Sequence, residues 1–189
     1  MKEFIKKLGS FFLDIIQVIV LALSIFVISY LFLFQPHQVR GNSMYANFYD
    51  QEFLLTDKIS YRFGEPQRGD VVIFKAPPSE PCAETECEYI KRIIGLPGET
   101  VEIREGKVII SNENGSQVLN ESDYLSGIPT PGEIQVTLGE NEYFVLGDNR
   151  PASSDSRRWG SVPRDDIIGR VFIRAWPLVA LAKFGAPAY

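Results

Sequence analysis

The sequence predicts a mainly β protein, with an antiparallel barrel or sandwich-like domain held by one N-terminal transmembrane helix. The first observation is an apolar run over residues 11–34, whose last 20 residues carry no charge. The second is the chain from residue 35 onward, where short β-branched or aromatic runs alternate with turn residues. The third is the abundance of turn formers, 15 glycines and 12 prolines in 189 residues, which favours many short strands.

The apolar run has the length of a membrane span. Its uncharged residues 15–34 would form a helix of about 30 Å, the thickness of the hydrocarbon core of a bilayer. A buried core helix would show a polar stripe, whereas the few polar residues of this run are scattered. A cleavable signal peptide has a shorter apolar region followed by small residues, but here Gln-Pro-His follows at 35–37. We therefore expect an uncleaved transmembrane helix over 11–34.

The flanking charges predict the orientation of this helix. Three lysines stand within the first seven residues, and the first basic residue after the run is Arg40. An excess of basic residues before the span favours an N-terminus inside the cell. We expect residues 1–10 to be a short cytoplasmic N-terminus, and residues 35–189 to be the extracytoplasmic domain of a single-pass protein of the cytoplasmic (inner) membrane.

Strand signals fill the exterior part of the chain. Each run is bounded by Gly, Pro, Asn or Asp, and the runs occupy 51–59, 69–77, 88–103, 107–111, 132–138, 141–148 and 169–177. Such a series of short strands is typical of an antiparallel barrel or sandwich. The polar, turn-rich stretch 111–133 is expected to be a surface excursion between strands, without a catalytic residue.

Composition excludes several classes of function. The net charge of −5 and the pI near 5.0 argue against nucleic acid as a partner, because neutralising phosphates requires a basic surface. Two cysteines and one histidine are too few for a dedicated zinc site. We expect neither a metal nor a cofactor.

The two cysteines, Cys82 and Cys87, are five positions apart in a short polar segment. On the outer side of a membrane the environment permits a disulfide, and a loop of this size could be closed by one if its geometry fits. The alternative is two free thiols in a loop. We expect the disulfide, with a structural role.

Two residues could carry nucleophilic chemistry. Ser43 follows the apolar run by nine residues, so it would lie within about 20–30 Å of the bilayer. Lys91 lies between Tyr89-Ile90 and Ile93-Ile94, and in a strand Tyr89, Lys91 and Ile93 would share one face. Apolar neighbours lower the pKa of a lysine, and the neutral amine can act as a general base toward a serine hydroxyl. The residues alone leave open a solvated loop serine and a lysine with its charge in water.

Five ordered motifs decide between these alternatives. They are the apolar anchor, GNSM at 41–44, RGDVVIF at 68–74, YIKRIIGLPGE at 89–99 and GDNRPASSDSRRWGSVP at 147–163. In this order they resemble the type I signal peptidases, the membrane-anchored Ser-Lys proteases of bacteria, whose catalytic β fold is similar to that of the SOS repressors. The last motif is the most diagnostic.

The resemblance implies a role for each matching residue. Ser43 would be the nucleophile and Lys91 the general base of a serine endopeptidase that removes signal peptides through an acyl-enzyme. Ser153 would orient the lysine amine, and Asp155 and Arg157 would form a structural salt bridge nearby. The resemblance also implies signal-peptide-bearing preproteins and the lipid bilayer as partners.

The resemblance also implies a shallow apolar substrate pocket for small residues. The matching positions are Val39, Met44, Phe48, Tyr89 and Ile90.

The chain departs from the family pattern at three places. Tyr45-Ala46-Asn47 replaces a sequence with proline, which should loosen the turn modestly. Gly41 stands where some relatives carry a serine that donates to the oxyanion, so we expect backbone N–H groups, chiefly that of Ser43, to serve instead. Arg40 replaces a proline, which leaves the preference of neighbouring subsites open.

Two other functions compete with this hypothesis. A self-cleaving repressor would share the Ser-Lys chemistry, but it carries a DNA-binding helix-turn-helix where this chain has an uncharged span. An anchored β module that binds partners without catalysis would leave Ser43 and Lys91 without a role, and its activity would survive replacement of either residue.

Overall fold

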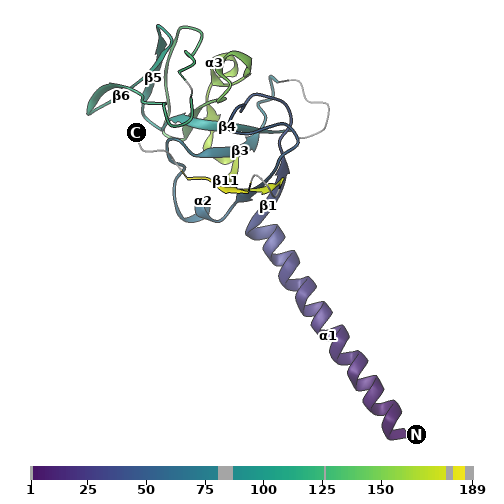
Figure 1. Cartoon of the computed structure of the whole chain (residues 1–189). Helices are drawn as coiled ribbons and strands as arrows, with labels where there is room; N and C mark the ends of the chain where they lie inside the picture. The colour runs from purple at the N-terminus through teal and green to yellow at the C-terminus, as the bar shows by residue number, and fades with distance from the viewer. Residues whose placement is uncertain (1, 81–86, 126, 178–180, 186–189) are drawn as a thin grey trace.

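The computed structural model describes residues 2–80, 87–125, 127–177 and 181–185 of the chain. One long helix, α1, extends from a β domain that contains all the other elements (Figure 1). All strand pairs of the domain are antiparallel, as the sequence predicts.

The helix α1 (Lys2–Phe32) has 31 residues, or about 46 Å of helix. A stretch of 25 residues, Lys6–Tyr30, is predominantly apolar and is not buried against the domain, so by length and composition it could cross a membrane. The helix begins earlier than the expected residue 11, because the lysines and the glutamate near its start are good helix formers. It ends before Phe34, which already pairs with Asp57 in the sheet.

The larger sheet has eight strands and carries most of the residues of interest. The order is β1-β2-β11-β3-β4-β9-β10, and β12 pairs with β11. Their bounds are β1 (Phe34–Gln38), β2 (Phe53–Asp57), β3 (Val71–Lys75), β4 (Glu88–Gly95), β9 (Glu142–Leu146), β10 (Val162–Pro163), β11 (Ile167–Trp176) and β12 (Ala182–Lys183).

The smaller sheet has four strands in the order β7-β6-β5-β8. Its strands are β5 (Thr100–Arg104), β6 (Lys107–Asn112), β7 (Gly115–Val118) and β8 (Ile134–Thr137). Short helices complete the domain: α2 (Ser60–Phe63), η1 (Arg150–Ala152), α3 (Ser156–Trp159) and η2 (Arg164–Asp166).

Each of the seven expected runs contains a strand, and the run 88–103 contains two. It divides at a turn where Gly98 has a φ of +77° and the Glu99 carboxylate accepts a hydrogen bond from Leu96 N–H at 2.8 Å. The stretch 111–133 differs from the expected excursion, because it includes β7 and its later part is tied to the domain. Buried Arg150 pairs with Glu121 and donates to Thr130.

Three apolar clusters form the core. One joins the smaller sheet to β4 and β9, and the other two lie on opposite faces of the larger sheet. Strand β4 contributes to all three, because Ile90 belongs to one face, Ile93 to the other and Ile94 to the inter-sheet cluster. The strand is therefore held rigidly where Lys91 emerges.

Candidate active site

Ser43 lies in the loop between β1 and β2. Two backbone hydrogen bonds close the base of this loop, from Val39 N–H to Glu52 C=O and from Gln51 N–H to Val39 C=O, both 2.8 Å. Gly41 takes a φ of +83° that favours glycine, and its N–H donates to Asp50 Oδ1 at 2.7 Å. These hydrogen bonds fix the base of the loop and the turn at Gly41.

The segment that follows β9 holds the same loop through hydrogen bonds from Asn149. Asn149 donates its N–H to Ser43 C=O at 3.0 Å and its side-chain amide to Asn42 C=O at 2.9 Å. Gly147 lets the two segments approach, since a Cβ at this position would lie 2.5 Å from Ser43 O and 2.2 Å from Ser153 Oγ. This pairing requires the fold, because Asn42 and Asn149 are 107 positions apart in the sequence.

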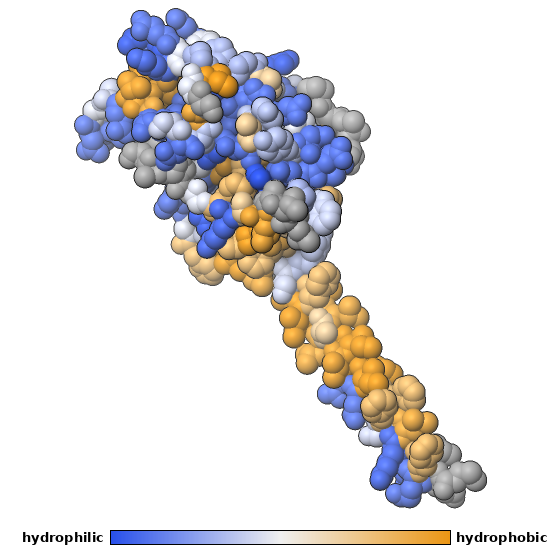
Figure 2. All heavy atoms as spheres, viewed as in Figure 1, coloured by the Kyte–Doolittle hydropathy of each residue, from blue (hydrophilic) through white to orange (hydrophobic). Residues whose placement is uncertain are grey.

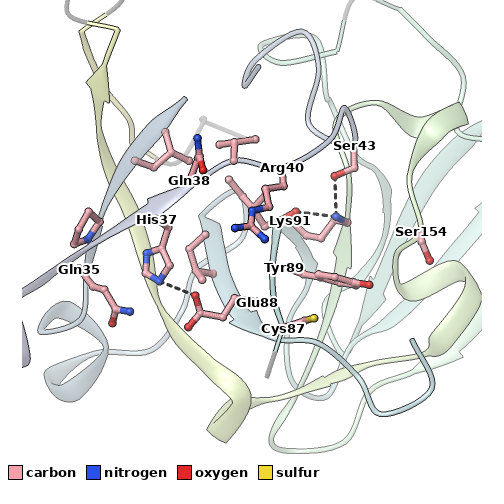
Figure 3. Close-up of a pocket in the computed structure, with 15 residues that line it drawn as sticks. Gln35, His37, Gln38, Arg40, Ser43, Cys87, Glu88, Tyr89, Lys91 and Ser154 are labelled. Carbon is pink, nitrogen blue, oxygen red and sulfur yellow. Dashed lines mark hydrogen bonds and ion pairs between the residues drawn. The ribbon is translucent and has the colours of Figure 1, made fainter. Parts of the chain in front are cut away.

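Lys91 comes from the middle of β4, where it pairs with Val72 of β3. Its side chain is buried, and Nζ lies 2.9 Å from both Ser43 Oγ and Ile90 C=O (Figure 3). The fold thereby brings Ser43 of the β1–β2 loop into hydrogen-bond contact with Lys91 of β4, which is 48 positions away in the sequence. The Tyr89 ring lies beside the amine, with its centroid 5.4 Å from Nζ.

Burial lowers the pKa of Lys91 from its ordinary 10.5 to about 8. Desolvation of the ammonium is the largest cause, and the negative charges of Asp155, Asp148 and Glu80 oppose it. A substantial fraction of the amine is therefore neutral near pH 8. A neutral amine next to a serine hydroxyl can accept its proton.

Asp148 and Arg92 form a buried bidentate pair next to this contact. Arg92 Nε and Nη2 donate to the two carboxylate oxygens at 2.8 and 2.7 Å, and Nη1 donates to Gly69 C=O at 2.9 Å. Asn47 Nδ2 donates to Asp148 Oδ2 and to Tyr124 C=O, both at 2.8 Å. The turn expected to loosen without its proline is therefore cross-linked through Asn47.

The residues with expected supporting roles lie in the segment that follows β9. Asp155 accepts from Gly147 N–H at 3.1 Å and caps α3, and Arg157 Nε lies 2.8 Å from its Oδ1. This ion pair fixes the segment that carries Gly147 against the end of β9. Ser153 Oγ lies 3.5 Å from Ser154 C=O, and its orienting action on Lys91 stays a prediction.

A cavity of about 630 Å³ opens in front of the Ser43–Lys91 contact. It runs between β1 and the start of β4, and among the expected pocket residues Val39, Tyr89 and Ile90 line it (Figure 3). Met44 and Phe48 are fully buried in the apolar cluster beneath it. They do not line the cavity but pack in one cluster with Val39 and Ile90, which do. Met44 Sδ also accepts from Asp148 N–H at 3.5 Å.

His37 lies elsewhere along the cavity. Its Nδ1 is 2.9 Å from Thr56 Oγ1 and its Nε2 is 3.0 Å from Glu88 Oε2. Burial lowers the pKa of His37, and the charge of Glu88 partly opposes this shift. Its partners are therefore Thr56 and Glu88, whereas the amine in contact with Ser43 is that of Lys91.

No group of three or more His, Cys, Asp or Glu side chains within the described residues could hold a metal ion. The expected disulfide depends on Cys82, which lies outside the described residues, and it stays a prediction.

Three positioning contacts were missed in the sequence: Asn47, the Arg92–Asp148 pair and the Asn149 clamp. A signal existed for Arg92, because a charged residue inside the apolar run of β4 requires a buried partner. Nothing in the sequence indicated which acid that partner is.

Comparison with known proteins identifies the family of this chain. A family model described as "Signal peptidase, peptidase S26" matches residues 12–176. The chain belongs to this signal peptidase family.

Relatives span most of the chain. Signal peptidase I of Leptolyngbya laminosa is 37% identical over 160 residues, which cover 82% of this chain and 75% of the relative. A probable signal peptidase I-2 of Synechocystis is 35% identical, over 78% of this chain and 65% of the relative. Signal peptidase IB of Staphylococcus aureus is 31% identical, over 77% and 80%. A crystal structure of a signal peptidase I from Enterococcus faecalis is 34% identical, over 57% of this chain and 97% of that one, with a TM-score of 0.47.

Proposed function

We propose that this member of the signal peptidase family is a serine endopeptidase that removes N-terminal signal peptides from exported preproteins. Ser43 is the nucleophile and Lys91 the general base. The observation that carries the proposal is the 2.9 Å contact between Lys91 Nζ and Ser43 Oγ at a buried amine with a pKa of about 8. A lysine is an effective base only when it is neutral at the working pH, and burial provides that state.

Acylation begins with attack of Ser43 Oγ on the carbonyl carbon of the scissile bond. The hydroxyl proton moves to Lys91 Nζ as the Oγ–C bond forms, and the carbonyl oxygen becomes an oxyanion. Collapse of this intermediate breaks the C–N bond, and the ammonium of Lys91 returns the proton to the leaving amine. The mature N-terminus departs, and the signal peptide remains as an ester on Ser43.

Deacylation repeats these steps with water. Neutral Lys91 accepts a proton from the water that attacks the ester carbonyl, and it returns the proton to Ser43 Oγ as the ester breaks. The Ser43 backbone N–H is our proposed donor to the oxyanion. Gly41 offers no hydroxyl, and its N–H already donates to Asp50.

The substrate would bind as an extended strand in the cavity. Strand β1 ends the larger sheet, and residues 88–91 of β4 pair with β3 on one side and with no other described strand on the opposite side. Both edges line the cavity. An extended peptide between them could hydrogen-bond to backbone and present its scissile carbonyl to Ser43. Val39, Tyr89 and Ile90 leave room for small side chains, which supports cleavage after Ala-x-Ala-like sequences.

The helix α1 would hold the domain at the membrane where these substrates arrive. Figure 2 shows apolar side chains along most of α1, and a second apolar area on the part of the domain nearest the helix. We propose that the apolar part of α1, from residue 11 to its end at Phe32, crosses the membrane. Residues 1–10 would lie in the cytoplasm and the β domain outside the cytoplasmic membrane. Digestion of intact spheroplasts with an external protease tests this orientation, since protection of the domain until permeabilisation would reverse it.

Cleavage of a purified preprotein tests the function directly. The full chain in detergent micelles is incubated with a signal-bearing preprotein, and the new N-terminus is located by mass spectrometry. The expected result is one cut after a small residue, lost in Ser43→Ala. No cut by the wild type, or an equal cut by Ser43→Ala, would refute the assignment.

A further inference from the structure

Glu80 is a buried acid next to the site that the reaction above does not use. It lies in the segment after β3, and its side chain is 7% exposed. Its Oε2 accepts from Ser154 Oγ at 3.0 Å and from Tyr89 OH at 3.5 Å. Both donors line the substrate cavity, where Tyr89 lies beside Lys91 (Figure 3).

Two contacts position the Tyr89 side chain in the cavity wall. Its ring packs edge-on against Phe74, with centroids 6.3 Å apart, and its hydroxyl reaches toward Glu80. The same carboxylate accepts from Ser154, which follows Ser153 in the segment after β9. Glu80 therefore joins two separate parts of the cavity wall. Without it, both side chains could turn into the cavity or away from it.

The charge of Glu80 is the least neutralised among three acids that act on Lys91. Many charged groups surround the lysine and its cavity: His37, Arg40, Glu80, Glu88, Arg92, Asp148, Asp155, Arg157 and Arg158. Asp148 and Asp155 each have an arginine within 2.8 Å. Arg158 lies 3.8 Å from Glu80, and its side chain is 75% exposed, so water screens this pair.

We propose that Glu80 is a positioning residue for signal peptide cleavage: its carboxylate fixes Tyr89 and Ser154 in the cavity wall, and its charge strengthens Lys91 as a base. This inference rests on the proposed function. Desolvation by itself would weaken the base further, and a weaker base accepts the Ser43 proton less readily. The neighbouring negative charge acts in the opposite direction, as its contribution to the pKa of Lys91 indicates.

Two variants separate the two actions. Glu80→Gln keeps an oxygen that can accept from Tyr89 and Ser154 but removes the charge, whereas Glu80→Ala removes both. Removing a negative charge lowers the pKa of Lys91, so the acid limb of kcat/KM moves to lower pH. We expect a shift of a few tenths of a pH unit, less than the roughly 1–3 units of a directly contacting charge. Glu80→Gln should then cleave up to about twofold faster than wild type on the acid limb, where more of its amine is neutral. On the plateau at higher pH, where the amine is neutral in both proteins, it should cleave more slowly because the base is weaker. A merely destabilised protein would not show this crossing of the two profiles.

The second readout is the preference for the residue before the cut. In a peptide series that compares Ala with Leu at this position, Glu80→Gln should discriminate like the wild type, and Glu80→Ala should discriminate less. The matched control is Glu102→Gln on β5, whose partner is Arg104 at 3.0 Å in the smaller sheet. It should reproduce the wild-type acid limb and the wild-type preference.

A titration independent of cleavage completes the test. The Lys91 amine of the full chain in micelles is followed by NMR with ¹⁵Nζ-labelled lysine, in a Ser43→Ala background with and without Glu80→Gln. A lower titration midpoint with Glu80→Gln supports the inference, and coincident curves overturn it. If Glu80→Ala discriminates between Ala and Leu before the cut as the wild type does, Glu80 does not fix Tyr89 and Ser154 in the cavity wall. If the wild type cleaves no preprotein, the proposed function fails, while the titration still decides whether Glu80 acts on the lysine.

Discussion

Replacing Lys91 by methionine is expected to raise the free energy of unfolding at pH 7 while it abolishes cleavage. Methionine is a flexible, unbranched side chain that fills a similar volume without a charge. Burial lowers the pKa of Lys91 from 10.5 to about 8, and such a difference penalises the folded ammonium by roughly 3 kcal/mol. The variant also loses two hydrogen bonds from Nζ, worth about 1 kcal/mol each. The net gain in stability is about 1 kcal/mol.

The stability difference between Lys91→Met and the wild type should depend on pH. The folded chain binds the Lys91 proton less tightly than the unfolded chain, so the penalty is fully present below pH 8. It falls as the pH rises from 8 toward 10.5, and it is absent above that value. The advantage of Lys91→Met over the wild type should therefore be largest at pH 7. At pH 10 or above it should vanish or reverse, because only the lost hydrogen bonds remain.

Denaturant unfolding of the full chain in micelles measures this difference. Both tryptophans, Trp159 and Trp176, lie in the β domain, so their fluorescence reports its unfolding. The control is Lys75→Met at the end of β3, where the lysine is exposed and the change should be small. If Lys91→Met is less stable than the wild type at pH 7, or if the difference does not vary with pH, the buried lysine carries no desolvation penalty and the reasoning fails.

Further predictions concern the reaction itself. Lys91→Arg should lose at least about 10²-fold in kcat with the fold retained, because a guanidinium stays protonated and cannot accept the serine proton; circular dichroism checks the fold, and retention of a tenth of the rate would exclude Lys91 as the base. The wild-type pH–rate profile should show an acid limb near pH 8, below which the rate falls about tenfold per unit, and an acid limb unrelated to Lys91 would contradict the proposed base. Asn47→Ala should lower kcat more than it changes KM, by about tenfold, because it removes hydrogen bonds to Asp148 and Tyr124 that fix the nucleophile loop; an unchanged kcat would show that the loop is held by other contacts. His37→Ala should leave kcat within about threefold of the wild type, since Thr56 and Glu88 are its partners, and a loss comparable to that of Lys91→Arg would contradict this.

Local patterns in the sequence determined the element types. An uncharged run of 20 residues predicts a membrane helix because its length matches the bilayer, and short runs between turn residues predict strands because their side chains alternate. The chemistry at Lys91 was also local in part, since Tyr89, Ile90 and Ile93 are its neighbours along one strand. These signals needed no knowledge of which strands pair. Four of the described strands, β1, β7, β10 and β12, were missed. In β1 and β7 proline and polar residues weaken the strand pattern, and pairing with β2 and β6 stabilises them. Strands β10 and β12 have two residues each, too few to show an alternating pattern.

The tertiary structure decided which distant residues meet. Ser43 and Lys91 are 48 positions apart, and the Asn47–Asp148 bond joins residues 101 positions apart. No local pattern encodes such pairs, because they depend on the order of strands in the larger sheet. In that order β2, β11 and β3 separate β1 from β4, so only the way the sheet curves in three dimensions brings the start of β4 beside the β1–β2 loop. The segment after β9 then contacts the same loop. The degree of burial of Lys91, and with it the pKa that makes the amine a base, follows from this packing, because desolvation is a property of the assembled core rather than of the neighbours in sequence.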